Sequence, residues 1–260
     1  MHRTLLPRQE IKYSKDFEFA IPFGITSYRE GDFTDLESLH VPTDLVACMS
    51  SLSYNSLDLK QAVLDALSPF QLMSKAMATR GLEVMLADDE GRTYAPVVYF
   101  GSWFGQQALL DHIWWSEYRR KMPPYLGKVT LIDKDKSAMA MAKWLRPLVV
   151  PEELDSVDYL VADALEHKID WMGNPGVIVW NGLEHFNIDK AAAYVQDAQP
   201  GTRFLVQATD MPSHDHLIGY HGTYAFAELW GNRKVEVLVE ASLSGIGFNR
   251  WMVGFTVERH

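Results

Sequence analysis

Two side chains with catalytic potential, Glu184 and His185, follow the apolar run 177–180 after a link of three residues. A histidine titrates near neutral pH, and a neighbouring carboxylate can orient it or act as the base itself. We therefore predict that this pair removes a proton from a bound substrate. A structural hydrogen-bonding role for either side chain is the alternative.

A second polar cluster, rich in histidine, follows the apolar run 204–207. Its members are Asp210, His214, Asp215, His216 and His221. Imidazole and carboxylate groups at such spacing can surround a divalent metal. Loops of this composition are more often solvated or internally hydrogen-bonded. We therefore assign no metal ligand here and favour recognition of the substrate by His214, His216 or His221, with metal binding as the alternative.

The elements that must position these groups are read from the apolar pattern. From residue 97 onward, short apolar runs alternate with helical patterns; the runs are 97–100, 129–132, 159–161, 177–180 and 204–207. Such alternation predicts a parallel sheet with helices on both faces. Two further runs, 235–239 and 251–257, have no helix between them and predict an antiparallel hairpin. The fold class is thus α/β, a three-layer Rossmann-like sandwich with a mostly parallel seven-stranded sheet.

The first of these runs ends in a turn with two glycines, Gly101 and Gly105, which flank Ser102 and Trp103. A strand, a glycine turn and a helix N-terminus place backbone N–H groups against a ligand. Asp133 ends the next run, where its carboxylate can accept hydrogen bonds from both hydroxyls of a ribose. The arrangement predicts a nucleotide-binding unit. A solvated turn acid or a helix cap is the alternative for Asp133.

This pattern, over residues 95–260, resembles the class I S-adenosylmethionine (SAM)-dependent methyltransferases. The resemblance implies that the glycine turn approaches the methionine part of SAM and that Asp163, after the third strand, contacts the adenine amine. It also implies a catalytic loop after the fourth strand, where Glu184 and His185 lie. The cofactor-binding residues it implies are Gly101, Ser102, Trp103, Gly105, Asp133, Asp163, Ala164 and Asn181. The expected activity is methyl transfer from SAM to a small-molecule or nucleotide-like acceptor.

The chain departs from the family pattern at two positions of the glycine turn. Tyr99 stands where the family has an acid that helps to hold the cofactor amine, and Trp103 stands at the middle glycine. The segments 101–105, 183–186, 207–210 and 249–252 are similar to a divergent methyltransferase-like group often encoded by bacteriophages. Two alternatives stay open: transfer of the aminocarboxypropyl arm of SAM, and a noncatalytic binding protein that retains the fold.

A nicotinamide-binding Rossmann domain also places a carboxylate after its second strand. It requires Gly-x-Gly-x-x-Gly, whose second glycine lets the backbone approach a pyrophosphate. Trp103 occupies that position here. The C-terminal hairpin also fits the methyltransferase arrangement better.

Composition narrows the partners and the location. The net charge of −10 disfavours binding to long duplex nucleic acid, which needs clustered Lys and Arg. No run approaches the roughly 18 to 20 apolar residues of a membrane helix, and the N-terminus lacks the apolar core of a signal peptide. A cytoplasmic protein without membrane contact is expected. The single cysteine, Cys48, excludes an intramolecular disulfide.

The sequence predicts two parts, an N-terminal cap or lid with helices over residues 1–94 and a SAM-binding catalytic domain over 95–260. Within the first part, Pro69 is predicted to start a helix that ends near Gly81. Residues 84–86 and 92–94 flank a polar turn and predict a small hairpin.

Overall fold

The computed structural model divides the chain into two compact units, one of residues 1–11 with 78–260 and the other of residues 12–77. The first unit contains the sheet. The domain boundary expected at 94–95 stays a prediction. Most of the predicted cap falls outside the described residues, so the cap stays a prediction. The structure describes residues 9–10, 69–87, 95–113, 128–146, 157–173, 175–210, 216–217, 226–231, 233–244 and 249–258.

The sheet of the first unit has the predicted mixed architecture. Its strands are β1 (Gln9–Glu10), β2 (Val97–Phe100), β3 (Val129–Asp133), β4 (Val157–Val161), β5 (Val177–Trp180), β6 (Arg203–Thr209), β7 (Val235–Ser244) and β8 (Asn249–Val257). They lie in the order β1-β7-β8-β6-β5-β2-β3-β4. Strands β2 to β6 pair in parallel, whereas β8 is antiparallel to both β6 and β7. The predicted fold class is confirmed; the two-residue edge strand β1, parallel to β7, is an addition that the pattern did not indicate.

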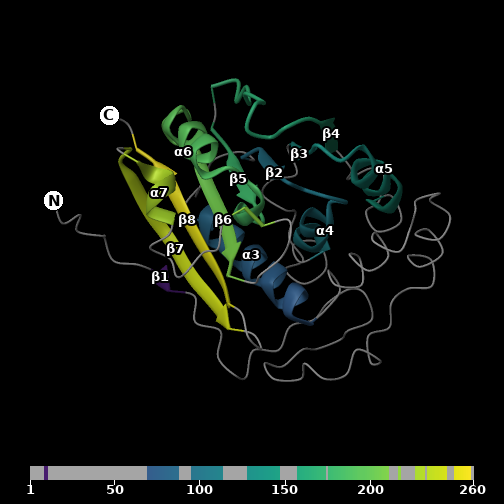
Figure 1. Cartoon of the computed structure of the whole chain (residues 1–260), viewed down its shortest axis with the longest axis horizontal. Coiled ribbons are helices and arrows are strands. Elements are labelled where there is room, and N and C mark those ends of the chain that lie inside the picture. The colour runs from purple at the N-terminus through teal and green to yellow at the C-terminus, as the bar shows by residue number, and fades with distance from the viewer. Residues whose placement is uncertain are drawn as a thin grey trace. The chain divides into compact units, whose positions relative to one another are not determined.

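Helices cover both faces of this sheet (Figure 1). They are α3 (Pro69–Ala87), α4 (Gln106–Ile113), α5 (Lys136–Leu145), α6 (Ile188–Gln196) and α7 (Ala227–Trp230). Alternate strand residues face opposite layers: Phe100 and Trp180 pack in one core cluster with residues of α6 and α7, whereas Tyr99 bonds to a side chain of α4. Burial on both faces explains why the central strands read as continuous apolar runs. In the described part of the chain, no helix is long and apolar enough to span a membrane.

Helix α3 continues past Gly81 to Ala87, so the predicted hairpin is wrong in its first strand, residues 84–86; its second strand lies outside the described residues. Gly81 is an interior position of the helix, not its end. A Cβ there would lie 2.7 Å from Met252 Sδ and 2.9 Å from Leu205 Cδ1. The glycine therefore allows the helix to approach the sheet closely, which local helix-ending signals do not reveal.

Gly176, directly before β5, is the tightest glycine of the sheet. A Cβ there would lie 2.0 Å from the carbonyl oxygen of Pro96, which accepts the N–H of Val177. We expect Gly176→Ala to lower the free energy of unfolding by about 3 kcal/mol, because a paired backbone carbonyl cannot withdraw. Gly173→Ala is the control: its φ of +87° strains alanine, but no atom of the described residues lies within 4 Å of the added Cβ, so about 1 kcal/mol is expected. Urea unfolding measures both, and equal losses would contradict the steric argument.

Candidate functional site

The candidate site lies where the strand order reverses, between β2 and β5. At such a switch point, ligands of open α/β sheets bind outside the carboxyl ends of the strands. The turn after β2 and the loop after β5 are neighbours there. A Cβ on Gly101 would lie 3.2 Å from Phe186 Cζ and 3.7 Å from the carbonyl oxygen of Asn181. The structure thus brings together Gly101 and Asn181, which were predicted from separate motifs.

The turn after β2 has an unusual backbone. Gly101, Trp103 and Gly105 have φ values of +56°, +48° and +76°, and Trp103 is one of two non-glycine residues with positive φ among the described residues. A bulky residue in this conformation costs about 1 to 3 kcal/mol and persists only where its surroundings hold it. Trp103 therefore keeps the conformation that a glycine would adopt at the same position.

Asp133 holds this turn against the end of β3. Its Oδ2 accepts the backbone N–H of Trp103 at 2.6 Å, and its Oδ1 accepts the N–H of Asp135 at 2.9 Å. An ionised carboxylate offers about four acceptor positions, so the half-buried Asp133 retains capacity for further donors. Two roles are thus compatible in one side chain: fixing the turn and accepting hydrogen bonds from a ligand.

Three N–H groups of the turn, those of Ser102, Trp103 and Gly105, are already donated within the protein. Ser102 N–H bonds to the Ile132 carbonyl at 3.1 Å, Gly105 N–H to the Ser102 carbonyl at 2.8 Å, and Trp103 N–H to Asp133. A dinucleotide-binding turn needs such groups for the pyrophosphate. The turn therefore suits a ligand without a pyrophosphate at this point, which counts against the nicotinamide alternative.

Asn181, the residue after β5, has a side chain suited to a ligand. Within the described residues, its Oδ1 is buried and has no hydrogen-bond partner. A buried acceptor without a donor costs about 1 to 3 kcal/mol. An amine donor on a bound ligand would remove that cost.

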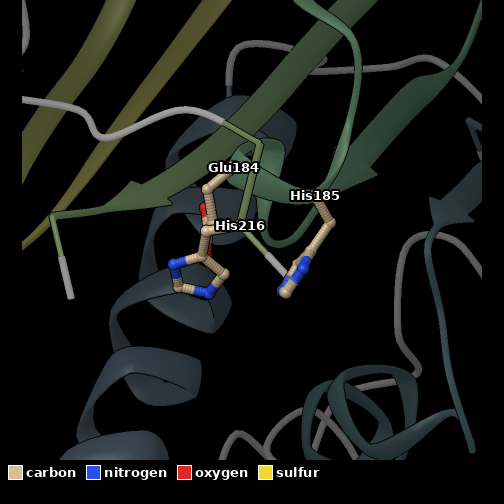
Figure 2. Close-up of side chains that lie close together, drawn as sticks. All are labelled: Glu184, His185 and His216. Carbon is tan, nitrogen blue, oxygen red and sulfur yellow. The ribbon is translucent and has the colours of Figure 1, made fainter. Parts of the chain in front are cut away.

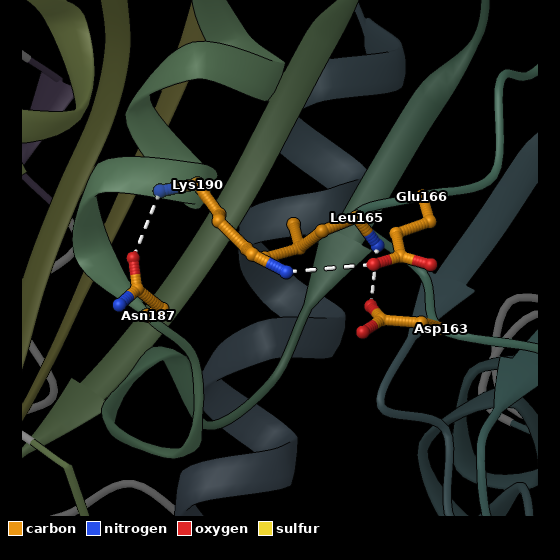
Figure 3. A network of polar contacts seen from close by, with 5 residues as sticks. All are labelled: Asp163, Leu165, Glu166, Asn187 and Lys190. Carbon is orange, nitrogen blue, oxygen red and sulfur yellow. Dashed lines mark hydrogen bonds and ion pairs between the residues drawn. The ribbon is translucent and has the colours of Figure 1, made fainter.

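Asp163 and Ala164 follow β4, the strand next to β3. Asp163 is exposed, and its Oδ1 accepts the N–H of Leu165 at 3.0 Å, whereas Ala164 is buried in the core (Figure 3). In the same view, Lys190 of α6 reaches Glu166 at 3.4 Å. Asp163 thus stabilises its own turn, with its second oxygen still at the surface, and its contact with adenine stays a prediction.

Tyr99 has a structural reason for its place in the motif. Its side chain is buried, and its hydroxyl donates to Asp111 Oδ2 at 2.7 Å. Asp111 Oδ1 also accepts from Thr79 Oγ1 at 2.5 Å and from Gln107 Nε2 at 2.8 Å. The Tyr99 side chain therefore ties β2 to α4 within the core, and a single acid within an apolar helical pattern was the only sequence signal for Asp111.

We expect Tyr99→Phe to lower the free energy of unfolding by about 1 to 3 kcal/mol, because it removes the hydrogen bond that the buried Asp111 Oδ2 accepts from the Tyr99 hydroxyl. Affinity for an adenosyl ligand should stay within a factor of about two, since the hydroxyl faces the core. Tyr194→Phe is the matched control, because the Tyr194 hydroxyl donates to an uncharged acceptor, the backbone carbonyl of His167, at 3.2 Å. This bond should contribute about 0.5 to 1.5 kcal/mol to the free energy of unfolding. A large loss of affinity in Tyr99→Phe would instead place that hydroxyl in the binding site.

Glu184, His185 and His216 form the second part of the site (Figure 2). Glu184 and His185 lie in the 3-10 helix η5 (Leu183–His185), and His216 comes from the segment after β6. The two segments are joined because Leu217 N–H donates to the Glu184 carbonyl at 2.7 Å. The two imidazole rings lie edge to face with centroids 4.7 Å apart. Of the three histidines predicted to border the site, the structure places His216; His214 and His221 lie outside the described residues.

Arg250 is the group at this site that the sequence reasoning missed. It lies in β8, opposite Thr209 of β6, and is 7% exposed. Burial lowers the pKa of its guanidinium, and the negative charge of Glu184 acts in the opposite direction.

Asp210 of the second polar cluster has a structural role. Its two carboxylate oxygens accept the backbone N–H and the side-chain amide of Asn249 at 2.5 and 2.9 Å.

Comparison with known proteins supports the fold assignment. No family model matches the chain, and no curated protein matches its sequence. Among solved structures, it is similar to magnesium protoporphyrin IX methyltransferase from Synechocystis PCC 6803 with bound SAH, at 8% identity and a TM-score of 0.54 over 83% of this chain and 94% of that one. The same enzyme with bound SAM gives 10% identity and 0.52 over 72% and 81%. The N-methyltransferase NodS from Bradyrhizobium japonicum WM9 gives 11% identity and 0.51 over 75% and 99%. The chain therefore has the Rossmann-like fold that these methyltransferases share.

Proposed function

We propose that this protein is a methyltransferase that binds SAM at the carboxyl ends of β2, β3 and β5. The acceptor is a small molecule or a nucleotide-like group. The observation that carries the proposal is the hydrogen bond from Trp103 N–H to Asp133, which holds a left-handed turn and a carboxylate side by side at the switch point of the sheet. The structural neighbours with bound SAM and SAH have the same fold.

The residues present fit such a cofactor at separate points. The Oδ1 of Asn181, which has no partner among the described residues, would accept a hydrogen bond from its ammonium group. Asp133 would accept from the ribose hydroxyls. Asp163 and Ala164 would lie by the adenine, with Gly101, Ser102, Trp103 and Gly105 along the methionine part. When bound, SAM supplies a methyl group on a sulfonium, which an in-line nucleophile can take.

Glu184 and His185 are the candidates for activating the acceptor. His185 is exposed, whereas Glu184 is 1% exposed and lies in the field of Arg250. The imidazole of His185 would take the proton of an acceptor hydroxyl or amine, and Glu184 would stabilise the imidazolium that results. The net charge and the small size of this polar cluster favour a small acceptor over long duplex nucleic acid.

Product analysis tests the reaction type. The protein, SAM and a panel of small hydroxyl, amine and nucleotide acceptors should yield S-adenosylhomocysteine together with a methylated product. Methylthioadenosine as the product would indicate transfer of the aminocarboxypropyl arm instead. Binding of SAM with neither product across the panel would favour a noncatalytic protein that retains the fold. A cytoplasmic location and membership of the bacteriophage-type group stay predictions beside this proposal.

A further inference from the structure

The cluster of Glu184, His185 and His216 has a geometry that acid–base chemistry alone does not require. One ligand atom from each side chain can be chosen so that all three lie within 4.8 Å of one another. Figure 2 shows the three side chains converging from two separate segments of the chain. Ligands at about 2.1 Å from one metal ion lie about 3.4 Å apart in a tetrahedral site, so small side-chain rotations would bring these atoms to that spacing.

The position of Glu184 supplies an independent argument. The residue is 1% exposed, and its Oε2 is buried without a hydrogen-bond partner in the described part of the chain. A buried carboxylate with an unfilled acceptor is costly unless a cation or a donor completes it. Arg250 contributes opposite charge, but its buried Nε likewise has no partner among the described residues. Arg250 thus offsets the charge of Glu184 without donating to its Oε2, which has no partner among the described residues.

The donor set defines the class of cation. Two imidazole nitrogens and one carboxylate oxygen suit Zn²⁺, Fe²⁺ and other first-row divalent ions, and three protein ligands leave coordination positions open. Mg²⁺ and Ca²⁺ prefer oxygen ligands throughout. Gly182 helps to aim the set: its φ is +78°, and a Cβ there would lie 2.9 Å from His185 Cδ2.

We propose that Glu184, His185 and His216 bind a divalent first-row transition metal with open coordination positions. This site differs from the sequence expectation, which assigned these side chains to proton transfer and substrate recognition. The next step rests on the proposed function: an oxygen of the methyl acceptor would occupy one of the open coordination positions of the metal. A bound metal would lower the pKa of that oxygen, so that its proton could pass to solvent before methyl transfer. His185 would then act as a metal ligand in place of the base described above.

The test uses tag-free, full-length protein stripped of metal with a chelator and titrated with Co²⁺ as a visible probe and with Zn²⁺ by calorimetry. One ion per chain and a Co²⁺ absorption band are expected. Removing a group that only hydrogen-bonds to a metal ligand costs about 10- to 100-fold in metal affinity. Removing a ligand itself should cost more, so His185→Ala and His216→Ala should each weaken metal binding by at least about 100-fold. His167→Ala, a histidine outside the cluster, should bind like the unaltered protein.

His185→Ala changes an exposed side chain and should fold normally, which circular dichroism verifies. The proposal is overturned by the absence of stoichiometric binding, or by unchanged affinity in both cluster variants. SAM binding is measured on the same samples. Metal binding without SAM binding would contradict the proposed function alone, and SAM binding without metal binding would contradict this inference alone.

Discussion

Replacing Asp133 with alanine should weaken SAM binding by roughly 10- to 150-fold, which corresponds to about 1.5 to 3 kcal/mol. The variant removes the charged acceptor offered to the ribose. It also releases the N–H of Trp103, which Asp133 accepts at 2.6 Å, from the only hydrogen bond recorded for it in the described structure. The strained turn would then have less reason to keep its left-handed conformation. Calorimetric titration with SAM measures the loss.

Asp135→Ala is the matched control, two residues along the chain. Asp135 caps α5 and accepts the N–H groups of Ser137 and Ala138 at 2.7 and 3.3 Å. Its loss should cost about 1 kcal/mol of stability and leave the affinity for SAM unchanged. Equal affinities of the two variants would remove Asp133 from the proposed site.

Glu184→Gln should lower kcat for methyl transfer by about 10²- to 10⁴-fold, the range of a lost activating group. The amide keeps the shape of the buried side chain but removes the charge that faces Arg250 and the oxygen available to a proton or a metal. The dissociation constant of SAM should change little, because the predicted cofactor contacts lie in other segments. Formation of S-adenosylhomocysteine with an acceptor from the panel measures kcat.

Glu166→Gln provides the control for this change. Glu166 is an exposed acid after β4 whose recorded ion pair, with Lys190, is at the surface. Its charge should have no effect on turnover beyond about twofold, since exposed pairs contribute little. Unchanged kcat in Glu184→Gln would leave the carboxylate with a structural role only.

The sheet was predictable because strands buried on both faces appear in the sequence as continuous apolar runs. The runs at 97–100 and 177–180 match β2 and β5 residue for residue, and the hairpin of β7 and β8 followed from the missing helix. The prediction of a ligand contact for Asp133 rests on the same kind of pattern, since a carboxylate at a strand end stands out against an apolar run. Its hydrogen bond to Trp103 was not predictable, because it depends on the conformation of a turn 30 residues away.

Other parts of the site left no local record. Arg250 is the second residue of β8, so it comes near Glu184 only when β8 lies beside β6. Asp111 lies within a helical pattern, and its three donors come from three different elements. The sequence predicts that helix α3 ends near Gly81, because a glycine often follows the last turn of a helix. In the structure the helix continues to Ala87, and Gly81 is needed because the sheet lies too close for a Cβ.

The central claim is an adenosyl cofactor at the switch point between β2 and β5, and the measurement that tests it most directly is a calorimetric titration of the purified protein. SAM, S-adenosylhomocysteine and NAD are titrated separately under the same conditions. The account predicts micromolar binding of both adenosyl ligands with one site per chain, and no binding of NAD. Binding of NAD alone, or of none of the three, would contradict it.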